Sequence, residues 1–198
     1  MSYQETIEQW NDFALLEPTL KEELKSLEGN EEALKDAFFA PLEFGTAGMR
    51  GILGVGINRM NIYTVRQATE GLARLMEAKG EEAKKRGVAI AYDSRHQSPE
   101  FAMEAAKTLG AHGIPAFVFE SLRPTPELSF AVRHLNALTG IMITVSHNPA
   151  DYNGYKVYNS EGCQVTEEAA AEILRCIEEV DIFTGVRTAG MEASDLLV

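Results

Sequence analysis

This sequence contains few cysteines, and it has neither a long apolar run nor a leader-like N-terminus. The only cysteines among its 198 residues, Cys163 and Cys176, are too far apart for a CxxC motif and lack metal-ligand partners at the usual spacing. We expect both to be reduced thiols without a role. No apolar run reaches the roughly 18 residues of a membrane helix, and the polar start "MSYQETIEQWND" is unlike a secretory signal. The sequence therefore predicts a cytoplasmic protein with no membrane partner.

Positive charge is also in short supply. Lysine and arginine number 18 against 30 acidic residues, so the net charge is −12. Binding to a nucleic-acid backbone requires a basic face, and we therefore exclude nucleic acid as a partner. A protein of this charge that binds phosphate must use local donors and not its overall field. The 45% hydrophobic and 24% charged residues are typical of a globular protein.

The chain divides into a helical beginning and a longer alternating pattern. Residues 1–40 predict a helical N-terminal extension with helices over 5–17 and 18–27 and a third capped by Asn30. Beyond residue 41, strands are expected over 87–95, 113–120, 137–145 and 154–159. Helices are expected over 62–86, from Ser98 with that serine as cap, over 125–135 with the same cap-then-proline device, and over 166–180. This alternation predicts an α/β fold, a three-layer α/β/α sandwich with a mostly parallel mixed sheet.

Two loops are expected at the carboxyl edge of that sheet, where ligands collect in such folds. One is "YDSRHQS", after the strand that ends near Ala91, and the other is "SHNPADYN", after Val145. Ser146 follows the apolar run "GIMITV", and Pro149 favours an exposed turn. The serine hydroxyl should therefore face the ligand edge from a rigid element. A plain strand-terminating serine turn would look similar from the serine alone.

The residues near Ser146 fit phosphoryl transfer better than other reactions. A hydrolase elbow would read G-x-S-x-G, and a P-loop would read G-x-x-x-x-G-K-[ST]; neither is present. A serine hydrolase would need one of the four histidines as base, namely His147, His96, His112 or His134. Spacing does not favour that geometry. By contrast, a serine nucleophile, the glycine-rich loop "GTAGMRG" with Arg50, and the nearby Lys156 suit a phosphate group.

These residues carry a family resemblance. "ITVSHNPADYNGYKVYN" resembles the phosphoserine loop of the α-D-phosphohexomutases, the phosphoglucomutase and phosphomannomutase superfamily, whose usual form is T-A-S-H-N-P. "FGTAGMRG" resembles the family's substrate-phosphate loop, and "AYDSR" its strand-end D-x-R element. The three motifs follow the family's order, and the wording of the first loop is most similar to the phosphoglucomutase and phosphopentomutase branch.

The resemblance implies a mutase that works through a phosphoenzyme. Ser146 would carry the phosphate and exchange it with a sugar phosphate, with glucose 1,6-bisphosphate as activator. His147 and Lys156 occupy the family's acid/base positions. The phosphate-binding positions are Arg50, Thr46, Gly48 and Asn153. The metal would be Mg²⁺, held through the phosphate on Ser146. We also expect like-charge repulsion from Arg50 to lower the pKa of Lys156.

The sequence departs from the family in two respects. Val145 stands where the family usually has alanine, and it could crowd the phosphate if it faced the loop. The family's D-x-D-x-D metal run, its G-E-x-S-G-H sugar loop and its C-terminal phosphate loop are absent. We therefore expect the extension at 1–40, the first family domain at 41–183, a linker at 184–198 to an absent second domain, and little or no activity alone. Phosphomannomutase or phosphopentomutase activity, or phosphosugar binding without catalysis, are the alternatives.

Overall fold

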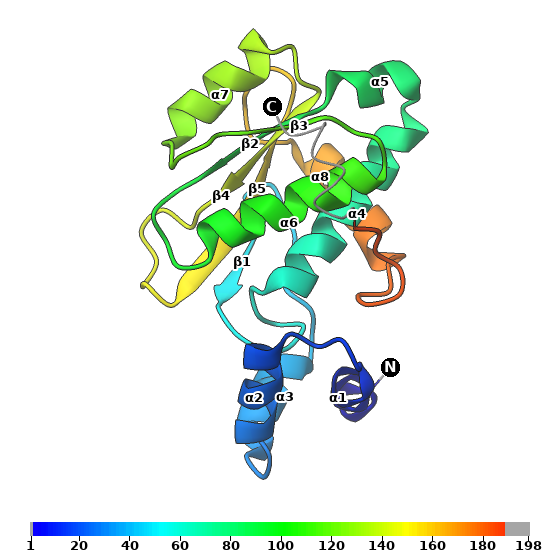
Figure 1. The fold of residues 1–198 in the computed structure, drawn as a ribbon, viewed down its shortest axis with the longest axis vertical. Helices are drawn as coiled ribbons and strands as arrows, with labels where there is room; N and C mark the ends of the chain where they lie inside the picture. The colour runs from blue at the N-terminus through cyan, green and yellow to red at the C-terminus, as the bar shows by residue number, and fades with distance from the viewer. Residues whose placement is uncertain (1, 189–198) are drawn as a thin grey trace.

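A five-stranded mixed sheet forms the centre of the molecule. The computed structural model describes residues 2–188 (Figure 1). The strands follow the order β1-β5-β4-β2-β3 across the sheet. Their bounds are β1 Met49–Ile52, β2 Val88–Tyr92, β3 Ala116–Val118, β4 Thr139–Ile143 and β5 Tyr152–Tyr158. β2 pairs in parallel with β3 and β4, whereas β5 is antiparallel to both β4 and β1. Only β5 therefore runs against the other described strands, and the prediction of a mostly parallel mixed sheet is confirmed.

Helices cover both faces of the sheet. α7, Thr125–His134, packs on one face, and α4, α6 and α8 lie on the opposite side (Figure 1). The bounds of these three are Ile62–Ala78, Ser98–Ala111 and Glu167–Glu178. Each face buries its own apolar cluster, because alternate strand residues point to opposite sides. In β2, for example, Ile90 belongs to one cluster and Ala91 to the other. The three-layer arrangement expected from the sequence is confirmed.

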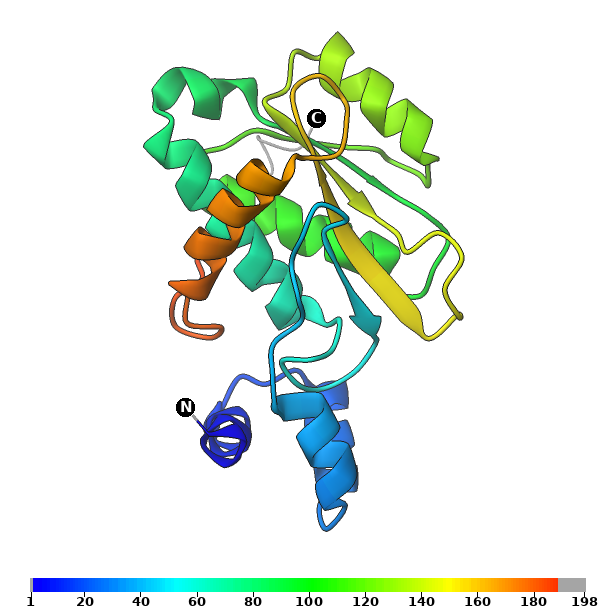
Figure 2. The same cartoon turned by 180° about the vertical axis from the view of Figure 1, so that it is seen from behind.

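The N-terminal helices form a smaller unit at one end of this sandwich (Figures 1 and 2). They are α1 Tyr3–Asp12, α2 Pro18–Ser26 and α3 Glu31–Phe38. As predicted, the Asn30 side chain caps α3 by accepting a hydrogen bond from an early backbone N–H of that helix. Trp10 is fully buried and makes edge-to-face contacts with Tyr63 of α4 and with Phe183. The extension is thus joined to the α/β unit by an aromatic cluster.

The helix expected over residues 62–86 is two helices. α4 ends at Ala78, and the short α5 spans Glu81–Arg86. Gly80 lies between them with φ = 94°, a left-handed backbone value that a continuing helix cannot use. The helical periodicity was read correctly on both sides of Gly80, but the glycine interrupts it.

The two expected serine and threonine caps are also corrected. Ser98 is the first residue of α6, and its hydroxyl donates to Asp93 instead of capping the helix. Thr125 likewise begins α7, with Pro124 in the cap position and no side-chain cap. In both cases the proline lies one residue further into the helix than the sequence suggested.

The carboxyl ends of β2 and β4 lie side by side, because these strands are parallel neighbours. Asp93–Arg95 follow β2, and Thr144–Ser146 follow β4, so the two loops singled out in the sequence meet at one edge of the sheet. None of the helices within residues 2–188 has the length and apolar character that a membrane crossing requires. The predicted linker over 184–198 lies mostly outside the described residues.

Candidate active site

Ser146 lies exposed just beyond β4 in a left-handed backbone conformation, with φ = 60°. Its hydroxyl Oγ is 3.2 Å from the Nζ atom of Lys156, which can donate a hydrogen bond to it. Its backbone N–H donates to Thr144 Oγ1 over 3.1 Å. A non-glycine residue at positive φ costs about 1–3 kcal/mol and persists only where surrounding contacts fix it. The serine is therefore held, and its hydroxyl faces solvent beside a cation.

Lys156 reaches the site from β5. It pairs across the sheet with Met142 of β4, near the end of the strand that leads into Ser146. Burial lowers the pKa of the Lys156 ammonium below its ordinary 10.5, the charge of Arg50 lowers it further, and Asp93 acts in the opposite direction. The direction agrees with the expectation from the sequence. Burial, however, contributes more than the repulsion from Arg50 on which that expectation was based.

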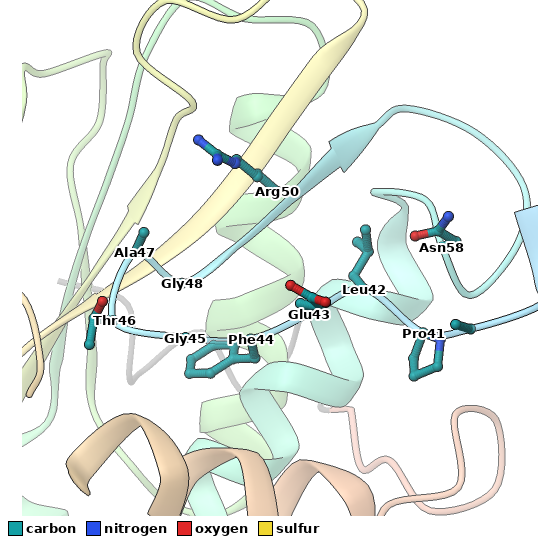
Figure 3. Close-up of a pocket in the computed structure, with 11 residues that line it drawn as sticks. Pro41, Leu42, Glu43, Phe44, Gly45, Thr46, Ala47, Gly48, Arg50 and Asn58 are labelled. Carbon is teal, nitrogen blue, oxygen red and sulfur yellow. The ribbon is translucent and has the colours of Figure 1, made fainter. Parts of the chain in front are cut away.

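Arg50 belongs to β1 and lies on the same face of the sheet as Lys156. It is the cross-strand partner of Gly154, which places both residues on one face, and Lys156 follows two residues later. The next residue, Gly51, faces the opposite way, against Leu42. Figure 3 shows the Arg50 side chain pointing away from Leu42 and toward the ribbon of β5. Arg50 and Lys156 thus place two cations on one face of the sheet, and Lys156 reaches Ser146 Oγ.

The glycine-rich loop makes a tight turn beside β5. Gly48 N–H donates to Gly45 O over 2.8 Å, and Thr46 and Ala47 are exposed at the tip. Gly48 has φ = 75°, and a Cβ there would lie 1.9 Å from the carbonyl oxygen of Tyr155. Glycine is therefore required for this loop to approach the strand that carries Lys156. The loop lines a cleft of about 550 Å³ that also includes Arg50 (Figure 3).

Asn153 does not lie where the sequence suggested. It is part of β5 and not of the loop, and it is fully buried. Its amide donates to His96 O and Ser98 Oγ, and its carbonyl accepts from the N–H of Gly154. These contacts support the sheet edge, and the expected contact with phosphate has no geometric basis here.

The histidines are not arranged as the base of a hydrolase. Within residues 2–188, the only side chain that hydrogen-bonds Ser146 Oγ is Lys156. His147 is exposed, and its ring makes no hydrogen bond within the described part of the chain. His112 is buried between Glu70 and Glu77, and His134 stacks on Phe130.

The Val145 side chain is buried and packs against Gly154. A Cβ at Gly154 would come within 2.6 Å of a Val145 methyl group, so the glycine provides the space for the valine. Of the two outcomes considered for this departure, repacking in the core is the one observed. The phosphate position is not crowded by it.

Two residues at this edge were not assigned roles from the sequence. Arg95 donates four hydrogen bonds to backbone carbonyl groups of the Ser146 loop, and Thr144 links the Ser146 N–H to Asp93. The "AYDSR" motif pointed to the right place. Its effect depends on how the loop after β4 folds over it, which the sequence pattern does not show.

Whether a divalent cation fits this site depends on the ligand atoms that the described residues offer. Within residues 2–188 there is no group of three or more His, Cys, Asp or Glu side chains arranged to hold a metal ion. Asp93, whose carboxylate faces the start of the loop, is already bound to Thr144 and Ser98. The described residues therefore fit Mg²⁺ only through a phosphate on Ser146.

Residues 41–182 match the model of the phosphoglucomutase/phosphomannomutase α/β/α domain I. The chain belongs to this family. A phosphoglucomutase from Staphylococcus aureus is 47% identical over 146 residues, which cover 74% of this chain and 26% of that protein. A human phosphopentomutase is 44% identical over 158 residues, which cover 77% of this chain and 26% of that protein.

Solved structures of the family share the fold. A protein from Thermus thermophilus superposes with a TM-score of 0.63 and 32% identity, covering 76% of this chain and 33% of its own. A family protein from Burkholderia thailandensis gives a TM-score of 0.58 at 24% identity, covering 74% and 31%, and this supports the fold alone. The chain thus spans about a quarter of the length of the curated relatives that it matches.

Proposed function

We propose that this chain is the nucleophile-bearing part of a phosphohexomutase of the phosphoglucomutase type. It would interconvert glucose 1-phosphate and glucose 6-phosphate through a phosphoserine at Ser146 and a bisphosphate intermediate. The observation that carries the proposal is the 3.2 Å contact between Ser146 Oγ and Lys156 Nζ at the ligand edge of the sheet. The family membership and the named relatives support the reaction class.

Each half-reaction moves one phosphoryl group and one proton. In the first half, a sugar hydroxyl attacks the phosphorus on Ser146, a new P–O bond forms, and the bond to Ser146 Oγ breaks. The Lys156 ammonium then supplies the proton to Oγ, while the attacking hydroxyl loses its own to a base, for which we propose His147. In the second half, neutral Lys156 takes the proton of Ser146 as Oγ attacks the other phosphorus, the bond between that phosphorus and the sugar oxygen breaks, and protonated His147 gives its proton to that oxygen. A lowered lysine pKa helps the second half, because it increases the neutral fraction.

The glycine-rich loop would bind the phosphate of the sugar that is not being transferred. Its backbone N–H groups and the Arg50 guanidinium are donors suited to phosphate oxygens. Thr46, exposed at the tip of the turn, could add a hydroxyl donor. Mg²⁺ bound to the Ser146 phosphate would neutralise charge during transfer. From the described residues, only that phosphate would ligate it.

The test is mutase activity of this chain on glucose 1-phosphate, with Mg²⁺ and glucose 1,6-bisphosphate, beside a Ser146→Ala control. Mannose and ribose phosphates run in parallel address the phosphomannomutase and phosphopentomutase alternatives. Intact-mass analysis after incubation with the bisphosphate reports whether Ser146 takes up a phosphoryl group. Because several groups act together in phosphoryl transfer, we expect uptake at Ser146 but little or no turnover.

A non-catalytic phosphosugar-binding role is the second candidate. It is favoured by the lack of a carboxylate metal site within residues 2–188. Saturable binding of glucose 1,6-bisphosphate without uptake of phosphate would support binding alone. Uptake that persists in Ser146→Ala would contradict the proposed nucleophile.

A further inference from the structure

Arg95 binds the loop that carries Ser146 through four backbone carbonyl groups. Its Nη1 donates to Pro149 O over 2.8 Å and to Tyr152 O over 3.2 Å. Its Nη2 donates to Ser146 O over 3.0 Å and to Asn148 O over 2.8 Å. The side chain is only 14% exposed, so these bonds are largely shielded from water. A planar guanidinium can serve four acceptors at fixed angles, which a lysine ammonium cannot.

Thr144 holds the other side of the same serine. Its Oγ1 accepts from the Ser146 N–H over 3.1 Å and donates to the Asp93 carboxylate. That carboxylate also accepts from the backbone N–H of Arg95 over 3.0 Å. The segment that follows β2 therefore fixes Ser146 twice, through Arg95 at its carbonyl group and through Asp93 and Thr144 at its N–H.

We propose that Arg95 is a positioning residue for phosphoryl transfer and that Thr144 assists it. Together they fix the Ser146 backbone at φ = 60°, the conformation in which Oγ lies beside Lys156 Nζ. Neither side chain contacts Oγ, so each acts through the serine that it holds. The inference rests on the proposed function, because positioning has an effect on rate only if Ser146 is the nucleophile.

Arg95→Lys keeps the charge but cannot reproduce the four bonds. A shift of about 1 Å at the reacting atom costs roughly 10²-fold in rate. We therefore expect the single-turnover rate of Ser146 phosphorylation by glucose 1,6-bisphosphate to fall by roughly that factor. The affinity for the bisphosphate should change by less than about threefold, because Arg50 and the glycine loop are unaltered. A proportional loss of affinity instead would contradict a positioning role.

Arg86→Lys is the matched control. Arg86 also donates from its guanidinium to backbone carbonyls, those of Asn136 and Ala137, but it precedes β2 at the far end of the sheet. Arg86→Lys should lose two hydrogen bonds of the same kind without altering phosphorylation. Thr144→Val and Thr144→Ser provide a second pair, because only serine keeps a hydroxyl between the Ser146 N–H and Asp93. We expect valine to slow phosphorylation and serine to retain most of the rate.

Backbone ¹⁵N relaxation provides a measurement that does not depend on the phosphorylation reaction. The Ser146 amide should have an order parameter of about 0.85 in the unaltered chain and below about 0.6 in Arg95→Lys. It should be unchanged in Arg86→Lys. An ordered Ser146 amide in Arg95→Lys, or an equal loss in Arg86→Lys, overturns the proposal. Absence of phosphorylation in the unaltered chain would count against the proposed function, and relaxation would still decide the role of Arg95. If Arg95→Lys does not fold, the Thr144 pair decides by the same two measurements.

Discussion

Lys156 Nζ lies 3.2 Å from Ser146 Oγ, although ten residues separate the two in sequence. The turn after Ser146 brings the chain back antiparallel to β4, with Met142 opposite Lys156. Lys156 is thus held by β5, and Ser146 by the loop that continues directly from the adjacent strand β4. The contact also places the cation where a phosphoserine would need one.

Replacing Arg50 should raise the pKa of Lys156. Burial and the positive charge of Arg50 both lower it, so Arg50→Gln removes one of the two causes and moves the pKa toward its ordinary 10.5. The neutral fraction of Lys156 at a given pH then falls. In a plot of phosphorylation rate against pH, the rise in rate should therefore occur at higher pH. NMR titration of ¹³Cε-labelled Lys156 measures the pKa directly.

Arg133→Gln is the control for this titration, because Arg133 lies in α7 and contacts Ser129 of the same helix. It should leave the Lys156 titration where it is. An unchanged or lower pKa of Lys156 in Arg50→Gln would mean that the two cations do not interact.

Gly48→Ala should destabilise the protein far more than Gly45→Ala. At Gly48 the new Cβ meets the backbone of Tyr155 and Lys156, and φ is 75°; at Gly45 nothing lies within 4 Å of it. Strain and overpacking together should cost about 2–4 kcal/mol at Gly48, against about 1 kcal/mol or less at Gly45. Urea unfolding of both variants measures the difference. Equal costs would show that the glycine turn does not press against β5.

Glu70 should make the folded state sensitive to acid. Its side chain is fully buried, and burial alone would raise the pKa of the carboxyl group. Hydrogen bonds from the Arg187 N–H, His112 and Arg74 together outweigh burial, so the pKa lies below its ordinary 4.5. A group whose pKa is lower in the folded state than in the unfolded state stabilises the fold at pH values above its unfolded-state pKa. That stability is lost as the pH falls below about 4.5 and through the folded-state pKa. Glu70→Gln should cost about 2–4 kcal/mol at neutral pH and flatten this acid limb.

Thermal unfolding measured across pH tests the role of Glu70. Glu172→Gln is the control, because that carboxylate is 46% exposed and lies 4.0 Å from Lys79. An acid limb that is equally steep in Glu70→Gln would assign the sensitivity to other carboxylates.

The fold could be predicted because its signals are local. Apolar runs such as "GIMITV" and the periodicity of α8 identify strands and helices without knowledge of their neighbours. Ser98 shows the limit of that reasoning. A serine before a proline has the sequence of a helix cap, but here its hydroxyl is bound to Asp93, five residues earlier, because of how the loop between β2 and α6 folds.

Part of the candidate site could also be predicted from the sequence. The strand-terminal position of Ser146 and the return of the chain at Lys156 followed from the pattern, and the structure brings these two together. Arg95 could not be understood in the same way, because its acceptors are backbone carbonyls of a loop that lies more than fifty residues away in sequence. The placement of Asn153 was not apparent either, because its position next to the loop does not show that the side chain is buried against His96 O and Ser98 Oγ.

Trp10→Ala should weaken the whole protein and not only the N-terminal helices. Trp10 is fully buried and packs against Phe38, Tyr63 and Phe183, so its removal leaves a cavity between the extension and α4 and should cost about 3–5 kcal/mol. Trp10→Phe should cost much less, about 1–2 kcal/mol, because it keeps most of the aromatic contact and also removes the Nε1 group, which is buried without a hydrogen-bond partner in the described structure.

Circular dichroism should follow the unfolding, because Trp10 is the single tryptophan and fluorescence would lose its probe. A single cooperative transition at lower denaturant in Trp10→Ala fits an extension that is part of one folding unit. Two separate transitions in the unaltered chain would instead show that residues 1–40 unfold independently of the α/β sandwich.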